Sequence, residues 1–406
     1  MSTTAPRRSP RPASLPPRLV LARNSVAGSF ALNGIVFATF ASRLPDVRER
    51  LDLSNGALGL LLLATSCGSL LALPATGWVI GRIGAGNTVR VGALLDTVGL
   101  LVAVLGAVLG TPAVTVVGLF LLGMGNGSWD VAMNVEGAEV ERRLGYTIMP
   151  RFHAGWSLGS FLGLGVATVL LALHVDVLVH VGVVVAVVLV AAHLTAARFL
   201  EPQDEDDETA VVRDSRSAWG EGRTLALGLM VLAFALTEGT ANDWLSLALI
   251  DGYDLPHWAG VGGFTVFVVA MTTGRLVGTA LLDRLGRVRV LLASAACTFV
   301  GVLLTVFGPH LAVVVVGILF WGAGAALGFP VGMSAAADDP VRAAARVSVV
   351  STIGYGAFLA GPPLLGWLAD HVGTLHMLLF LAAMVVPSAL AVGAARERPV
   401  PPDHTA

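Results

Sequence analysis

Charged residues are scarce in this sequence. Asp, Glu, Lys and Arg make up 13% of the 406 residues, against about 25% in a typical soluble domain. Lysine is absent, and the net charge of −2 argues against a nucleic-acid-binding surface. There are only two cysteines, Cys67 and Cys297, and each lies inside an apolar run. Their positions argue against a disulfide framework or a thiolate metal site.

Apolar residues dominate the rest of the chain. The hydrophobic set accounts for 55% of it, and there are also 48 glycines. A water-soluble fold of this length could not bury so much apolar surface. A transmembrane helix needs about 20 apolar residues, so twelve helices would use roughly 240 and leave roughly 166 for loops and tails. The composition therefore predicts an all-α polytopic membrane protein.

Hydropathy places twelve membrane-spanning helices along the chain. They are expected at 22–42, 56–80, 89–110, 113–138, 151–173, 177–198, 224–249, 258–281, 289–308, 311–335, 347–369 and 374–395. The acidic insert between the sixth and seventh is expected to be a solvated linker. The predicted regions are a disordered cytoplasmic N-terminus, a six-helix bundle, a cytoplasmic linker, a second six-helix bundle and a cytoplasmic tail, at 1–20, 21–198, 199–223, 224–396 and 397–406.

Arginine placement predicts the orientation. If the N-terminus is cytoplasmic, all arginines but four fall in cytoplasmic segments or helix ends. The exceptions are Arg43, Arg48 and Arg50 in the first external loop and Arg275 inside a span. Because basic residues accumulate on the cytoplasmic side, we expect a multi-pass protein of the cytoplasmic (inner) membrane with both termini inside.

The two predicted bundles share a glycine pattern. A shift of 199 residues lays 118–125 on 317–324, with three glycines aligned, and lays Gly155-Trp156 on Gly354-Tyr355. Glycines at equivalent positions allow close helix packing, and internal repeats are common in transporters. The pattern predicts two pseudo-symmetric halves.

Two loops carry related motifs. The loop after the eighth predicted helix reads Asp283-Arg284-Leu285-Gly286-Arg287. It resembles the major facilitator superfamily signature G-x-x-x-D-R-x-G-R-R, with Thr279 in place of the first glycine. The loop after the second helix is similar but has Gly81 at the acidic position. The resemblance implies a gating motif at the cytoplasmic helix ends, formed by Gly77, Arg82, Gly84, Asp283, Arg284, Gly286 and Arg287. The alternative is a polar turn rich in arginine.

Four further segments resemble the YbjJ-like inner-membrane proteins, which are relatives of the fucose permeases. They are 127–137, 152–159, 238–244 and 361–366. In a fucose permease the fourth helix carries a protonatable glutamate with an asparagine one turn later, and Asp130 with Asn134 matches this pair. The aspartate of the permease's first helix has no counterpart, because the polar residue there is Asn33. This difference argues against fucose as the solute.

Polar residues inside the predicted helices mark a path for solute and protons. Asn126, Asp130 and Asn134 are spaced by four and therefore share one helix face. An ionised aspartate at mid-membrane costs about 2.5–3.5 kcal/mol, and keeping it neutral at pH 7 costs about 4 kcal/mol. Since these costs are similar, hydration can decide its protonation.

Each embedded residue has two interpretations. The proton-coupling candidates are Asp130, Glu238, Asp243 and His153. The substrate-binding candidates are Asn33, Asn126, Asn134, Trp156, Asn242 and Tyr355. The alternative for each is a hydrogen-bonded or packed contact between helices. We expect Asp96 and Arg275 to be structural.

The sequence therefore predicts a secondary active transporter, not an enzyme. It would move a small polar solute by alternating access, coupled to protons, as a monomer in a lipid bilayer without a cofactor or nucleic acid. The chain has no Walker motif, H-E-x-x-H or nucleophile elbow, so we expect no metal or catalytic site. The alternatives are a drug or metabolite exporter, a uniporter, a non-transporting sensor and a membrane-embedded enzyme.

Overall fold

The computed structural model describes residues 16–146, 148–200, 215–338 and 342–396, and these residues are almost entirely helical. Most of the predicted N-terminal segment 1–20 and of the linker 199–223, and all of the tail 397–406, lie outside the described residues. At the end of the linker, Ser215–Gly220 forms a short 3-10 helix, η1.

The helices before the linker are α1 (Pro17–Arg50), α2 (Asn55–Val108), α3 (Pro112–Leu144), α4 (Met149–Ala172) and α5 (Val177–Ala196). Those after η1 are α6 (Gly222–Thr240), the π-helical turn η2 (Ala241–Leu245), α7 (Ser246–Tyr253), α8 (His257–Leu285), α9 (Arg287–Phe307), α10 (Leu311–Ala325), α11 (Gly328–Ala336), α12 (Ala343–Val372), α13 (Thr374–Met377), α14 (Leu379–Ala391) and η3 (Val392–Ala395). Most ends agree with the predicted ranges to within a few residues. The largest difference is α1, because a helix can continue beyond the apolar stretch that hydropathy detects.

Helix α2 is too long for one membrane crossing. Its 54 residues would extend about 81 Å at 1.5 Å per residue, against a hydrocarbon core of about 30 Å. Gly84, with φ 79° and ψ 160°, interrupts the helix. Thr65 and Asp96, on either side of this break, both pack against α3. The two segments of α2 therefore run side by side, as the predicted ranges 56–80 and 89–110 require.

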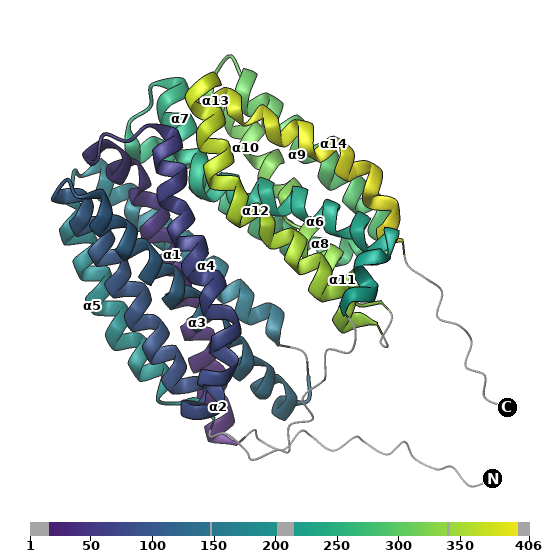
Figure 1. Ribbon diagram of the computed structural model, residues 1–406. Coiled ribbons are helices and arrows are strands. Elements are labelled where there is room, and N and C mark those ends of the chain that lie inside the picture. Colours follow the sequence, from purple (N-terminus) through teal and green to yellow (C-terminus); the bar gives the residue numbers. More distant parts are fainter. Residues whose placement is uncertain (1–15, 147, 201–214, 339–341, 397–406) are drawn as a thin grey trace, which may run out of the picture.

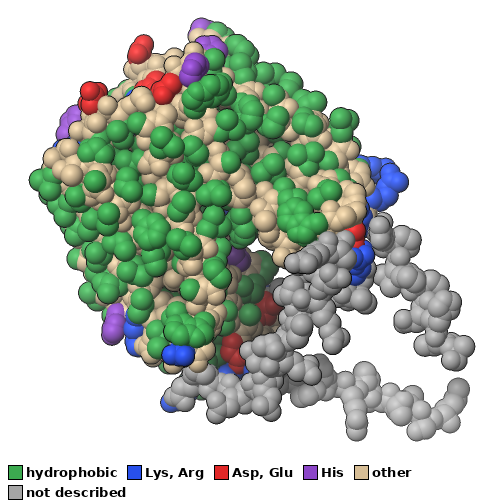
Figure 2. All heavy atoms as spheres, in the orientation of Figure 1, with side chains coloured by type: hydrophobic (Ala, Val, Ile, Leu, Met, Phe, Trp, Pro, Cys, Tyr) green, Lys and Arg blue, Asp and Glu red, His purple; other side chains and the backbone are tan. Residues whose placement is uncertain are grey.

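The surface is typical of a membrane protein. Eleven helical runs among the described residues are long and apolar enough to cross a bilayer, and α2 counts as one of them. Figure 2 shows apolar side chains over the broad middle of one face, with charged and histidine side chains toward its ends. The chain is therefore a multi-pass membrane protein.

The helices lie in two neighbouring sets. In Figure 1 the helices up to α5 form a first group, and those from α6 onward form a second group beside it. We call the end at which α1 begins and η3 ends the proximal end, and the end at which α1 ends and α2 begins the distal end. Helix α2 packs against α12, and α4 packs against α8. The ribbons of the two groups diverge toward the proximal end (Figure 1).

Glycines allow the groups to approach closely at the distal end. A Cβ atom on Gly59 of α2 would collide with the backbone of Pro362 on α12, and one on Gly366 would collide with the backbone of Asn55. Only a residue without a side chain permits such backbone contact. The distal halves of α2 and α12 are thus packed together directly.

Aligned glycines also make similar contacts inside each group. Gly125 on α3 packs against the backbone of Asp96, and Gly324 on α10 packs against the backbone of Thr298. The shift of 199 residues aligned these two glycines in the sequence. Asp96 in the first group thus occupies the place that Thr298 occupies in the second.

Candidate functional site

A cavity of about 360 Å³ lies between the two groups. Its wall is formed by α1 to α4 of the first group and by α6, η2 and α12 of the second. Seven of the ten predicted proton and solute residues line it: Asn33, Asn126, Asp130, Trp156, Asn242, Asp243 and Tyr355. The volume lies in the range of small-molecule sites. The fold therefore brings residues from distant parts of the sequence to one polar cavity.

A chain of hydrogen bonds organises the first-group wall. The indole nitrogen of Trp156 on α4 donates to Asn33 on α1 at 2.9 Å. Asn33 in turn donates through Nδ2 to Oδ1 of Asn126 on α3 at 3.0 Å. These bonds fix the amide orientation of both asparagines, because each oxygen faces a donor. The Nδ2 group of Asn126 then remains available to a solute.

Asp130 and Asp243 reach the cavity from different groups. Nδ2 of Asn134 donates to the Asp130 carboxylate at 3.1 Å and to its backbone oxygen at 2.8 Å. The Asp130 side chain is nevertheless exposed. Asp243 lies in η2, next to Asn242. Short π turns occur often at functional sites, and this one turns Asn242 and Asp243 toward the cavity.

The Glu238 carboxylate is paired with an arginine side chain. Both oxygens of its carboxylate accept hydrogen bonds of 3.0 Å from the guanidinium of Arg275 on α8. Neither residue lines the cavity. Glu238 and Asn242 are four residues apart, but Asn242 lies in the π turn η2 and lines the cavity, whereas Glu238 does not. The sequence predicts a structural role for Arg275, but its partner could not be predicted because Glu238 lies 37 residues away in the sequence.

The candidate His153 and three tryptophans within the helices do not line the cavity. His153 is exposed on α4 and packs edge-to-face on Phe30, with ring centroids 5.1 Å apart. Trp129 is fully buried and donates to Ser29 at 2.8 Å. Trp244 and Trp321 are also fully buried. These three tryptophans are buried between helices and do not line the cavity, whereas Trp156 and Tyr355 supply aromatic surface to it.

Asp96 belongs to the cavity, although the sequence suggested a structural role. Its side chain is 2% exposed and lines the cavity wall. No described residue donates a hydrogen bond to its carboxyl group. Thr65 on the same wall has a buried hydroxyl that also lacks a partner among the described residues. An isolated aspartate in an apolar run gave no sequence signal for this placement. Three His, Cys, Asp or Glu residues that could together hold a metal ion do not occur in the described part of the chain.

At the distal end an ion pair joins the two groups. The guanidinium of Arg48 on α1 binds both carboxylate oxygens of Asp251 on α7 at 2.5 Å. Arg48 also donates to Asn55 at 3.0 Å, and Thr374 donates to Asp251 at 3.2 Å. The sequence gave no indication of this site because its members come from three distant parts of the chain, namely the α1–α2 region, α7 and α13.

A helix cap also joins the two groups at the distal end. The carboxylate of Asp370 on α12 accepts hydrogen bonds of 2.8 Å from the backbone N–H groups of Asn55 and Gly56. These groups begin α2, where unpaired N–H groups and the helix dipole favour an anion. Nearer the cavity, Ser66 donates to the backbone oxygen of Phe358 at 2.7 Å. All of these bonds connect the first group to the second.

The two loops with the signature motif have nearly identical backbone conformations at the proximal end. Gly84 has φ 79° and ψ 160°, and Gly286 has φ 76° and ψ 159°. This conformation is accessible almost only to glycine. Arg82 lies over the ring of Trp78, 4.2 Å from its centroid. A Cβ atom on Gly77 would meet open space, so packing does not require glycine there.

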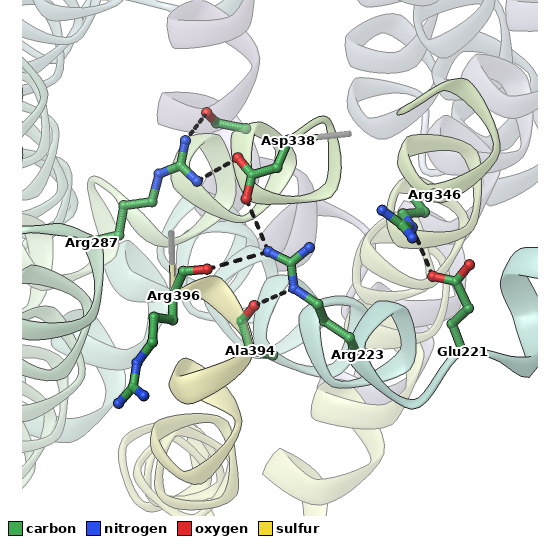
Figure 3. A network of polar contacts seen from close by, with 8 residues as sticks. Glu221, Arg223, Arg287, Asp338, Arg346, Ala394 and Arg396 are labelled. Carbon is green, nitrogen blue, oxygen red and sulfur yellow. Dashed lines mark hydrogen bonds and ion pairs between the residues drawn. The ribbon is translucent and has the colours of Figure 1, made fainter. Parts of the chain in front are cut away.

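Arg287 of the second loop belongs to a network within the second group (Figure 3). It binds Asp338 at 2.6 Å, and Asp338 also binds Arg223 at 2.9 Å. Arg223 donates to the backbone oxygen of Ala394 at 2.9 Å. By contrast, Asp283 and Arg284 are exposed, and no described residue forms an ion pair with either. In this conformation these two side chains therefore form no ion pair with a described residue of the first group.

Glu221 anchors the start of α6 in the same region (Figure 3). It accepts a hydrogen bond of 2.7 Å from Arg346 and one of 2.9 Å from Thr224, and it pairs with Arg342 at 2.5 Å. Burial raises the pKa of the Glu221 carboxyl, but the hydrogen bonds and positive charges outweigh burial, so this pKa lies below its ordinary value. The carboxylate therefore stays ionised at neutral pH.

Comparisons with known proteins agree with this architecture. The sequence profile of the Major Facilitator Superfamily matches residues 26–277 and 257–406. The chain is 34% identical over 374 residues to an uncharacterized transporter, y4wD, of Sinorhizobium fredii, covering 90% of this chain and 96% of that one. Among solved structures, the nucleoside transporter NupG has a TM-score of 0.73 at 15% identity, covering 94% of this chain and 99% of that one. The fucose:proton symporter FucP of E. coli has a TM-score of 0.63 at 14% identity, covering 94% and 100%.

Proposed function

Because the chain belongs to the Major Facilitator Superfamily of membrane transporters, we propose that it is a proton-coupled secondary transporter of a small polar solute. We propose twelve membrane-spanning helices in two pseudo-symmetric halves, 21–198 and 224–396, with α2 contributing two of them. The closer relationship to the YbjJ-like proteins remains a prediction.

One observation supports alternating access. Polar side chains of both groups converge on one cavity, and the hydrogen bonds described between the groups lie beside the cavity or at the distal end. A solute bound there would be shielded on the distal side. Separation of Arg48 from Asp251, with closure at the proximal end, would expose the same site to the opposite side.

The orientation of this state follows from the arginines. The proximal end carries most of them, including Arg82, Arg223 and Arg287, so we propose that it faces the cytoplasm. The structure is then the inward-facing state of the cycle. Asp283 and Arg284 would engage when the proximal ends close, which explains why both are exposed in this conformation.

Asp130 is the proposed proton carrier. It lies in the cavity, it is not part of an ion pair with any described residue, and Asn134 can remain bonded to it in either protonation state. Glu238 is a weaker candidate, since its protonation would have to break the bond to Arg275. Asp243 shares the exposure of Asp130 to the cavity and is the second candidate.

The test is transport by the purified protein in sealed proteoliposomes. A thermal-shift screen of sugars, amino acids, nucleosides and organic acids first identifies a ligand, because ligands stabilise the folded state by mass action. We expect that ligand to accumulate against its gradient when a proton gradient is imposed, and not after a protonophore is added. Flux that ignores the proton gradient would indicate a uniporter. Binding without flux would indicate a sensor and would overturn the proposal.

A further inference from the structure

The cavity wall carries acidic groups without basic ones. Asp96 and Asp130 reach it from the first group, and Asp243 reaches it from the second. No arginine or histidine lies among the described residues that line it, and the chain contains no lysine. An anionic solute would therefore meet like charges in a site of low dielectric constant, with no nearby side chain to offset the repulsion.

Two arginines within the helices, Arg43 on α1 and Arg275 on α8, already bind other partners. Arg275 donates two hydrogen bonds of 3.0 Å to Glu238 and one of 3.4 Å to the backbone oxygen of Ala326, and its ion pair with Glu238 is neutral overall. Arg43 donates to His180 at 3.0 Å and pairs with Asp46 toward the distal end. The positive charge of each arginine is therefore already offset or bound by a partner inside the protein.

The carboxyl group of Asp96 has no hydrogen-bond donor among the described residues. A carboxyl group that is 2% exposed and lacks a hydrogen bond from the described residues is costly to bury. Helix packing does not require an aspartate at position 96, because Thr298 makes the corresponding contact with Gly324 in the second group. The unpartnered hydroxyl of Thr65 lies on the same wall. Both groups are hydrogen-bond acceptors in the cavity wall that lack a donor among the described residues.

The rest of the lining suits a cation as well. Trp156 and Tyr355 contribute aromatic rings, and Phe37 and Phe358 extend these surfaces. An ammonium group over an aromatic face gains about 0.5–2 kcal/mol. The asparagines offer amide oxygens and N–H groups to hydroxyls on the same molecule.

We infer that the solute of the proposed transporter is an organic cation: a small amine that also carries hydroxyl or aromatic groups. Its ammonium group would be attracted by the cavity carboxylates, above all those of Asp130 and Asp243. The inference rests on the proposed function, since it names the class of molecule that the same cavity would carry.

The first test measures the charge of the cavity directly. A single cysteine is introduced as Leu73→Cys on the cavity wall, in a background with Cys67→Ala and Cys297→Ala. Its reaction rates with a cationic and an anionic methanethiosulfonate of similar size are compared with those of a free thiol. We expect the cation-to-anion ratio to exceed that of the free thiol by about tenfold or more at low ionic strength.

The matched control adds Asp130→Asn and Asp243→Asn to the same cysteine variant. Loss of these charges should lower the ratio toward the free-thiol value. A ratio at or below that of the free thiol in the original variant would overturn the inference. This measurement does not require transport, so it separates a wrong solute class from a failure of the proposed function.

The second test compares molecules that differ in charge. Purified protein is melted with glucosamine, glucose and glucuronate, and with tyramine, 4-hydroxyphenethyl alcohol and 4-hydroxyphenylacetate. We expect the cationic member of at least one set to raise the melting temperature most and the anionic members to raise it least. If the cationic members raise it no more than their neutral partners, the inference is wrong.

Discussion

The guanidinium of Arg275 on α8 donates two hydrogen bonds of 3.0 Å to the carboxylate of Glu238 on α6. Each residue neutralises the other inside an apolar part of the protein, where an isolated charge would be expensive. Because of this ion pair, Glu238 is not a free acid. The proposed proton coupling therefore rests on the carboxyl groups of the cavity.

We predict that this pair contributes to stability as a unit. Glu238→Gln and Arg275→Gln should each lower the free energy of unfolding by about 1–3 kcal/mol, because each leaves a charge without its partner. The double variant should lose less than the sum of the two. Melting of the four proteins in detergent would measure this coupling, and additive losses would show that the pair contributes little.

The distal ion pair should hold the cavity closed on that side. Replacing Arg48 with alanine removes its bonds to Asp251 and Asn55, so distal-open molecules should become more frequent. With Phe40→Cys as a reporter on the cavity wall, we expect alkylation from the distal side to become about tenfold faster for each 1.4 kcal/mol lost.

Arg50→Ala provides the matched control for the distal prediction. Arg50 ends the same helix, but it pairs with Asp176 of its own group at 3.9 Å. Its loss should leave the labelling rate of the reporter unchanged. If Arg48→Ala and Arg50→Ala change the rate equally, the Arg48–Asp251 pair does not act as a closure.

Asp130→Asn should uncouple transport without unfolding the protein. The amide keeps the size of the side chain and a hydrogen-bonding oxygen, but it cannot ionise. We expect accumulation driven by a proton gradient to be lost and counterflow exchange to be retained, since exchange requires no net proton movement. Asp243→Asn, measured beside it, identifies the second candidate. Accumulation with an unchanged pH dependence in both variants would refute both assignments.

The proximal loops should depend on glycine. Gly84→Ala and Gly286→Ala force a side chain into a conformation that costs about 1–3 kcal/mol, so both should lower the melting temperature. Gly182→Ala is the control, because it lies within α5 with open space around its Cβ position and should be neutral or slightly stabilising. Similar melting temperatures for all three variants would contradict the role assigned to the turns.

Asp283 should mainly stabilise the conformation in which the proximal ends are closed. It is exposed here, so Asp283→Asn should barely change the stability of this state. If Asp283 holds the proximal ends together after closure, the substitution should increase the share of proximal-open molecules. Faster alkylation of the Leu73→Cys reporter from the proximal side would show this. Equal rates for the parent and the Asp283→Asn protein would favour a simple polar turn.

Much of the architecture could be predicted from local properties of the chain. A membrane-spanning helix must satisfy its backbone hydrogen bonds within itself, so apolar runs of sufficient length predict helices and their approximate ends. The turn at Gly286 could also be predicted locally, because this glycine belongs to a short arginine-rich loop motif. The spacing of Asn126 and Asp130 on one helix face also placed both on the cavity wall.

The sequence by itself determined the helices, the signature loops and most of the polar residues of the cavity. Only the tertiary structure decided which polar groups neutralise one another: Glu238 with Arg275, Arg48 with Asp251, and Asp96 with no described residue. The physical reason is that helix formation depends on neighbours a few residues apart, whereas the surroundings of a charge depend on side chains from other helices. In an apolar interior, those surroundings decide whether an acid is a structural partner or is left for a proton or a solute.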